Sequence, residues 1–146
     1  MKQFIFVIVY LISFNTFANL VETKWEVKEY FGEVWYANPK KIIGKNQEFY
    51  QGYSQGIFYN CYYEGQSYTY TRYKSHKEFH NNKEFLLFER YIGKFDKTNG
   101  DIFVHRITCS GNNEFNRKVF YPFITFENIK IAYYLFEGAI YKLEYN

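Results

Sequence analysis

The clearest pattern along the chain lies in its C-terminal half, where apolar and polar residues alternate. The run Asp101–Cys109 alternates between two faces, which is the period of a half-buried β-strand. One face holds Phe103, His105, Ile107 and Cys109, and the other holds Ile102, Val104, Arg106 and Thr108. The apolar run Glu84–Lys94 comes before it, and Asn99-Gly100 lies in the connection between the two runs. Because Asn-Gly between apolar runs is a strong hairpin signal, we expect these runs to form a hairpin.

Three further strands are expected after a loop at Gly111-Asn112-Asn113. The first is Lys118–Phe126, which Pro122 interrupts, so it should be an edge strand or carry a bulge. Turns at Asn128 and at Glu137-Gly138 then delimit two more runs. These runs are Ile129–Phe136 and Ala139–Tyr145.

The N-terminal half is less regular. The segment Lys24–Tyr36 is apolar enough for a strand pair or for a short helix, and Gly44–Gly56 is broken by three glycines. Ile57–Tyr63 and Tyr68–Tyr73 both alternate, with a hairpin turn expected at Glu64-Gly65 between them. The most polar stretch, 75–84, is compatible with a loop or a helical turn, and a turn is expected at Asn38-Pro39-Lys40-Lys41.

About eight to nine short strands with few helices predict an all-β fold, a small antiparallel meander barrel or sandwich. Such a chain resembles the calycin group, which includes the lipocalins, at the level of the fold alone. The lipocalins carry Gly-x-Trp near the N-terminus, whereas this chain has Gly32-Glu33-Val34-Trp35, one residue longer. No functional residue is therefore carried over from that group.

The first eighteen residues have the layout of a secretory signal peptide. Lys2 is followed by the apolar run Phe4–Phe14 and then by Asn15-Thr16-Phe17-Ala18, with small residues where signal peptidase cuts. The run is too short to span a bilayer, which takes about 20 apolar residues. We expect residues 1–18 to be removed, 19–146 to form a single β-barrel domain, and the product to be periplasmic or secreted, without stable membrane insertion.

Cys61 and Cys109 are the two cysteines of the chain, and they lie 48 residues apart. In an exported protein such a pair predicts one structural disulfide, although two free buried thiols are the alternative. Closing a loop of this length stabilises a fold by roughly 4 kcal/mol on the chain-entropy model.

Composition excludes some classes of function. The 146 residues are 47% hydrophobic and 25% aromatic, which is too apolar for a disordered chain. The formal charge of +3 is too small to favour nucleic acid as a partner. Short strands and a disulfide also argue against a transmembrane barrel.

The most distinctive feature is the density of tyrosine between Tyr50 and Tyr73. Tyrosine has a large apolar ring with a polar tip, which suits a half-wet binding surface. The alternative is that these tyrosines fill and cover a small barrel. Lys40, Lys41 and Lys45 would extend the surface toward acidic partners. The candidate residues for ligand or partner binding are Tyr59, Tyr63, Tyr68, Tyr70 and Arg72.

Motifs for catalysis are scarce, so we expect a protein that binds and is not an enzyme. No Gly-x-Ser-x-Gly elbow, Gly-rich phosphate loop or His-Glu-x-x-His is present, and no cofactor is indicated. His76 and His80 would share one helix face and could bind zinc with His105 or Glu84 as the third ligand. Two exposed loop histidines are the simpler interpretation.

Three functions remain open at this point. The leading hypothesis is an exported binding protein that uses a tyrosine-rich surface or barrel mouth to hold a partner protein, as inhibitors and immunity proteins do. One alternative is a carrier of a small apolar ligand, which would need a cavity of about 300 Å³ or more. The other is a metal-binding protein or an enzyme with convergent carboxylates or histidines.

Overall fold

The computed structural model describes residues 19–32, 38–61, 66–74, 76–82, 86–93, 100–109, 118–119, 122–136 and 138–146. The expected signal peptide, the turn at Glu64-Gly65 and the loop at 111–113 lie outside these residues. The elements follow in the order β1 (Thr23–Phe31), η1 (Pro39–Lys41), β2 (Asn46–Phe49), β3 (Ser54–Gly56), β4 (Ser67–Tyr73), α1 (His76–His80), α2 (Leu86–Ile92), β5 (Ile102–Cys109), β6 (Lys118–Val119), β7 (Phe123–Phe126), β8 (Ile131–Phe136) and β9 (Ala139–Tyr145).

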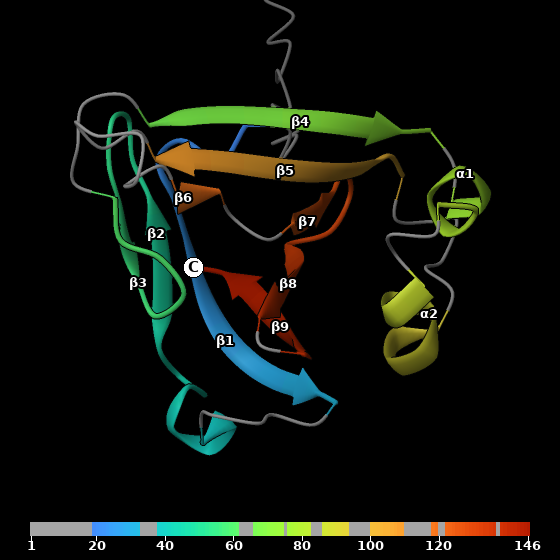
Figure 1. Ribbon diagram of the computed structural model, residues 1–146, viewed down its shortest axis with the longest axis horizontal. Helices are drawn as coiled ribbons and strands as arrows, with labels where there is room; N and C mark the ends of the chain where they lie inside the picture. Colours follow the sequence, from blue (N-terminus) through green and yellow to red (C-terminus); the bar gives the residue numbers. More distant parts are fainter. Residues whose placement is uncertain are drawn as a thin grey trace, which may run out of the picture.

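The nine strands form one antiparallel sheet that curls into a half-barrel (Figure 1). The path runs β3-β2-β1-β9-β8-β7-β5-β4, and β6 pairs with the end of β5. This is the strand order of a meander barrel, in which β1 pairs with β9. The two ends of the path, β3 and β4, are not joined by a ladder of backbone bonds, and we call this break in the sheet the cut. The all-β prediction is confirmed, and Lys24–Tyr36 contributes one strand, β1, in its described part.

The C-terminal strands follow the sequence pattern closely. The two predicted runs after Asn128 form β8 and β9, which pair from Ile131↔Glu144 to Phe136↔Ala139. The predicted run around Pro122 is divided into β6 and β7, and both pair with β5. A proline has no N–H for the ladder, and the strand is interrupted at this point. The expectation of an edge strand is wrong, because β7 lies between β5 and β8.

The prediction of a strand over Glu84–Lys94 is wrong, because α2 forms there. The expected hairpin with β5 is therefore wrong as well. Phe88 and Ile92 are four residues apart and lie on one helix face, where both pack into the core cluster on the outer face of the sheet. The polar stretch before it also contains a helix, α1, whose Phe79 is fully buried.

The strand predicted over Ile57–Tyr63 is also wrong in its described part. Within 57–61, only Cys61 makes a β-bridge, to Ser54. Phe58 and Tyr59 are consecutive and both buried, which breaks the alternation of a strand. The buried side chain of Gln47 takes the place of a neighbouring strand: its Oε1 accepts from Phe58 N at 3.2 Å and its Nε2 donates to Tyr59 O at 3.2 Å.

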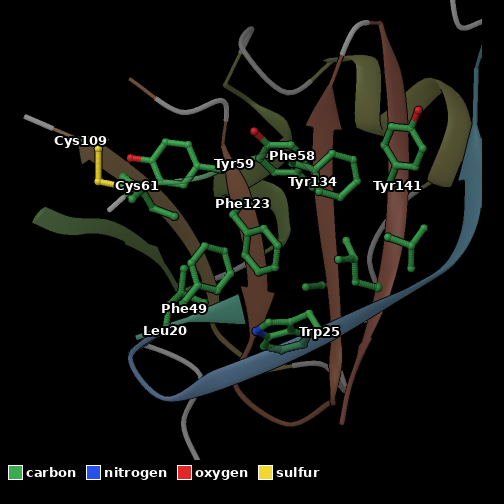
Figure 2. Close-up of a cluster of buried hydrophobic side chains, with 14 of the residues drawn as sticks. Leu20, Trp25, Phe49, Phe58, Tyr59, Cys61, Cys109, Phe123, Tyr134 and Tyr141 are labelled. Carbon is green, nitrogen blue, oxygen red and sulfur yellow. A yellow bond between two sulfur atoms is a disulfide. The ribbon is translucent and has the colours of Figure 1, made fainter. Parts of the chain in front are cut away.

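Aromatic side chains fill the inside of the curl (Figure 2). Phe123 lies at the centre of this inner cluster, with ring-centroid distances of 5.6 Å to Trp25, 5.1 Å to Phe49 and 5.9 Å to Tyr134. Phe58 packs against Tyr134 and, at 4.9 Å, against Tyr141. All of these rings are buried. Burying one such side chain stabilises the fold by about 1.5–3 kcal/mol, so this cluster is a main source of stability.

A second cluster lies on the outer face of the sheet and includes residues of both helices, which lie to one side of the sheet in Figure 1. Phe79 of α1 and Phe88 of α2 pack with the outward side chains of β5, β7 and β9, which are Ile102, Val104, Ile124, Phe126 and Ile140. Parts of β5, β7 and β9 are therefore covered on both faces. The predicted division of β5 into two faces is confirmed, since Ile107 and Cys109 belong to the inner cluster and Ile102 and Val104 to the outer one.

The predicted disulfide is present and joins Cys61 to Cys109, with Cα atoms 5.8 Å apart. Cys61 is bridged to the β3 edge of the sheet, and Cys109 ends β5, the neighbour of β4. Both residues are buried. The covalent bond therefore links the two sides of the cut in the sheet path.

Candidate functional site

Of the five residues predicted to form a binding surface, the structure describes four, and these do not all lie on an exposed surface. Tyr59 is 4% exposed and belongs to the inner cluster, so its assignment to a surface is wrong. Tyr63 lies outside the described residues. Tyr68 is half-buried, whereas Tyr70 is 52% exposed and Arg72 is exposed. Burial and the nearby Tyr68 raise the pKa of Tyr59, as expected for a phenol inside the core.

Tyr68 belongs to a polar seam that crosses the cut between β4 and the β2–β3 hairpin. Its hydroxyl donates to the backbone carbonyl of Tyr50 at 3.0 Å and lies 3.1 Å from the Ser54 hydroxyl. Gln66 bonds to Ser54 and Tyr68, and its Nε2 donates to Tyr50 O at 3.3 Å. Burial raises the pKa of Tyr68, and the bonds to Ser54 and Gln66 oppose that rise. We define the seam as Tyr50, Ser54, Gln66 and Tyr68.

Next to the seam, Tyr50 and Glu48 form a second polar group on the hairpin. The Tyr50 hydroxyl donates to Glu48 Oε2 at 2.7 Å, Gln55 Nε2 donates to the same oxygen at 2.9 Å, and Lys24 Nζ lies 3.1 Å from Oε1. The bond from Gln55, followed by those from Tyr50 and Lys24, holds the pKa of Glu48 at about 2, and the bond to Glu48 raises the pKa of Tyr50 to about 12. Tyr53 stacks on Tyr50 with ring centroids 4.5 Å apart.

Tyr70 and Arg72 lie on β4 beyond the seam, and both are held in place by β5. The Tyr70 ring packs edge-on against Phe103, with centroids 5.6 Å apart, and lies 6.0 Å from the His105 ring. Arg72 Nε forms an ion pair with Asp101, and the Arg72 side chain remains 53% exposed. Sequence reasoning missed Asp101, and also Thr69 and Thr71, which are exposed on the opposite face of β4. The alternation over Tyr68–Tyr73 could have identified the two threonines.

The histidines are not brought to one place. His76 and His80 share α1, with ring centroids 6.5 Å apart. His105 is 1% exposed on the inner face of the sheet, and its Nε2 lies 2.7 Å from Thr125 Oγ1. The suggestion that His105 completes a zinc site with α1 is therefore wrong, because α1 covers the outer face. Glu84 lies outside the described residues, which contain no group of three or more His, Cys, Asp or Glu residues placed to hold a metal ion.

The three lysines expected to extend the binding surface are remote from β4. Lys40 and Lys41 lie on η1 and Lys45 follows it, all of them exposed. In Figure 1 this teal turn lies at the foot of β1 and β2, whereas β4 crosses the top of the molecule. The basic turn and the β4 surface are therefore separate features.

In the part of the chain that the structure describes, no helix combines the length and the apolar character needed to cross a bilayer. No protein-family model matches the chain, and neither the curated proteins nor the solved structures contain a match. Function must therefore be argued from the residues themselves.

Proposed function

We propose that the chain is an exported binding protein of the periplasm that holds a partner protein against β4, with Tyr70 and Arg72 as the main contacts. The observation that carries this proposal is the position of Tyr70, which is half exposed although its ring is fixed against Phe103. A rigid, exposed tyrosine loses little conformational entropy on binding, and Tyr and Arg are enriched among residues that dominate the affinity of protein interfaces.

Packing inside the curl favours a partner protein over a small apolar ligand. A carrier needs an internal cavity, but the buried rings of Trp25, Phe49 and Tyr134 all pack around that of Phe123, at centroid distances of 5.1–5.9 Å. Tyr70 and Arg72 pair with His105 and Phe103, so their side chains lie on the inner side of β4 at the open edge of the curl, and another molecule would contact them there without entering a cavity. This is the arrangement expected of an inhibitor or immunity protein, which binds its target through a surface.

Export is supported by the disulfide and by the pattern of the first eighteen residues. Cys61 and Cys109 are oxidised and buried, and stable structural disulfides are typical of the periplasm and of secreted proteins. The partner would accordingly be a protein that is found in, or enters, the same compartment.

Affinity capture with matched variants tests this function. The tagged mature chain would be used to capture proteins from the periplasm of its own host, and each captured protein would be quantified by mass spectrometry. Tyr70→Ala and Arg72→Ala should each lower recovery of one partner by at least about tenfold, because hot-spot truncations weaken binding by about 2 kcal/mol or more. Tyr91→Ala is the control, since Tyr91 is 37% exposed on α2, away from β4.

Two results would contradict the proposal. In one, every captured protein is recovered equally well by wild type and by both β4 variants. In the other, the control variant loses the partner as strongly as Tyr70→Ala does. Circular dichroism of each variant would confirm that the fold is kept, as expected for substitutions at exposed positions.

A further inference from the structure

Strand β4 is an edge of the sheet. Within the described residues it pairs with β5 along its whole length, from Ser67↔Thr108 to Tyr73↔Ile102, and the sheet path ends there. Its contacts across the cut are made by the side chains of the seam. An edge strand presents unpaired N–H and C=O groups at alternate residues, and these can pair with a strand of another molecule.

The usual protections of an edge strand are missing from β4. Ser67 and the run Thr69–Arg72 are exposed, the register with β5 is unbroken, and β4 contains no proline. Its single charged residue is Arg72, which Asp101 of the same chain partly neutralises. Natural proteins usually blunt such edges with bulges, prolines or several charges. A seven-residue strand without these features is suited to being paired.

The sequence of β4 is nearly symmetrical about Tyr70, which is flanked by Thr69 and Thr71. We propose that β4 pairs antiparallel with β4 of a second copy of this chain, with Tyr70 opposite Tyr70 at a twofold axis. In that register Thr69 lies opposite Thr71 of the second copy, and Tyr68 lies opposite Arg72. Aromatic pairs and Thr–Thr pairs are both favourable cross-strand neighbours.

Charge is compatible with this register. Arg72 faces the ring of Tyr68 of the second copy, an arrangement that allows a cation–π contact. The two Arg72 side chains are kept apart, whereas a register shifted by four residues would place them directly opposite each other, which is destabilising. The central register also uses all seven residues of both strands.

The dimer should be weak and reversible. A single strand pair buries less surface than the roughly 1,600 Å² of a standard stable interface, so it should dissociate on dilution. Self-pairing would cover Tyr70. If β4 also holds a partner protein, the dimer and the partner complex exclude each other. This consequence rests on the proposed function.

Cysteine substitution tests the register directly. Opposite Cα atoms in an antiparallel pair are about 4.5–5.5 Å apart, within the roughly 4.4–6.8 Å that a disulfide spans. Purified Tyr70→Cys protein should therefore form a covalent dimer under mild oxidation. Thr69→Cys and Thr71→Cys should each stay largely monomeric alone but crosslink to each other when mixed. These two variants are matched controls, because each adds one exposed thiol to the same strand.

Sedimentation of protein without added cysteines provides the second measurement. Wild type should pass from monomer to dimer as its concentration rises from about 10 μM to about 1 mM, as a weak strand-pair interface predicts. Tyr70→Lys should weaken the association at least about tenfold, because it places two ammonium groups opposite each other, whereas Tyr91→Lys should leave it unchanged.

A monomer at every concentration, no crosslink from Tyr70→Cys, or a stronger crosslink from Thr69→Cys alone would overturn the inference. All of these measurements use the purified chain alone. Their failure would therefore leave the capture of a partner protein, and with it the proposed function, unaffected.

Discussion

The Tyr68 hydroxyl donates a hydrogen bond to the backbone carbonyl of Tyr50, 3.0 Å away, across the cut between β4 and the β2–β3 hairpin. In a closed barrel this position would be occupied by a ladder of backbone bonds. Here the seam and the Cys61–Cys109 disulfide hold the two sides together. The curl of the sheet therefore depends on a few side chains.

Removing the disulfide should destabilise the fold strongly. We expect Cys61→Ala/Cys109→Ala to lower the free energy of unfolding by about 4 kcal/mol, because the closed loop restricts the unfolded chain. Urea denaturation followed by tryptophan fluorescence measures the change. Wild type treated with a reductant serves as the control and should behave like the double variant. A loss below about 1 kcal/mol would show that the seam alone holds the curl.

Gln47 should be necessary for the segment after β3. Its side chain is 1% exposed and is hydrogen-bonded to Phe58 N, Tyr59 O and Gln55 O. Gln47→Leu should lower the free energy of unfolding by about 2 kcal/mol or more, because buried backbone groups lose hydrogen bonds. Gln51→Leu is the matched control, at an exposed position between β2 and β3, and should change the free energy of unfolding by less than about 1 kcal/mol. Equal effects of the two variants would refute this role.

Phe123 tests whether the inside of the curl is filled. Its ring contacts those of Trp25, Phe49 and Tyr134 and is 1% exposed. Phe123→Ala should cost about 3–5 kcal/mol of stability in denaturant titrations, since it leaves a cavity among packed rings. Leu86→Ala, at a position that is 54% exposed, should be nearly neutral. A small effect at Phe123 would mean that the interior is loosely packed and would favour a carrier.

Stability should fall in acid partly through Glu48. Its hydrogen bonds with Gln55 and Tyr50 and its ion pair with Lys24 hold its pKa in the folded protein at about 2, below the ordinary value of 4.5. The folded state therefore binds fewer protons, and the stabilisation is full above pH 4.5 and is lost as the pH falls toward 2. Denaturation midpoints of wild type and Glu48→Gln should converge over this range. A constant difference between them would contradict the assignment.

Local pattern predicted much of the sheet. Period-two alternation identified the faces of β5, and the predicted runs end at the last residues of β7, β8 and β9, although β7 and β8 begin later than predicted. The disulfide was predicted from two cysteines and from the signal-peptide pattern expected over the first eighteen residues. Each of these features depends on residues close together in the sequence or on composition.

Features that depend on distant residues were not predictable. The alternation over Ile57–Tyr63 indicated a strand, but the amide of Gln47 binds that backbone and lets Phe58 and Tyr59 both turn inward. For the same reason the sequence could not separate buried Tyr59 from exposed Tyr70. The apolar run in α2 was predicted as a strand, because its helical period becomes evident only where Phe88 and Ile92 pack against the outer face of the sheet.

Native mass spectrometry of the mature protein, isolated gently from its host, tests the central claim most directly. A filled barrel that binds through β4 should carry no small-molecule adduct, and it should be found with a protein-sized partner that Tyr70→Ala no longer retains. An adduct of a few hundred daltons that survives desalting and is unaffected by Tyr70→Ala would contradict the account, because it would place the ligand inside the curl.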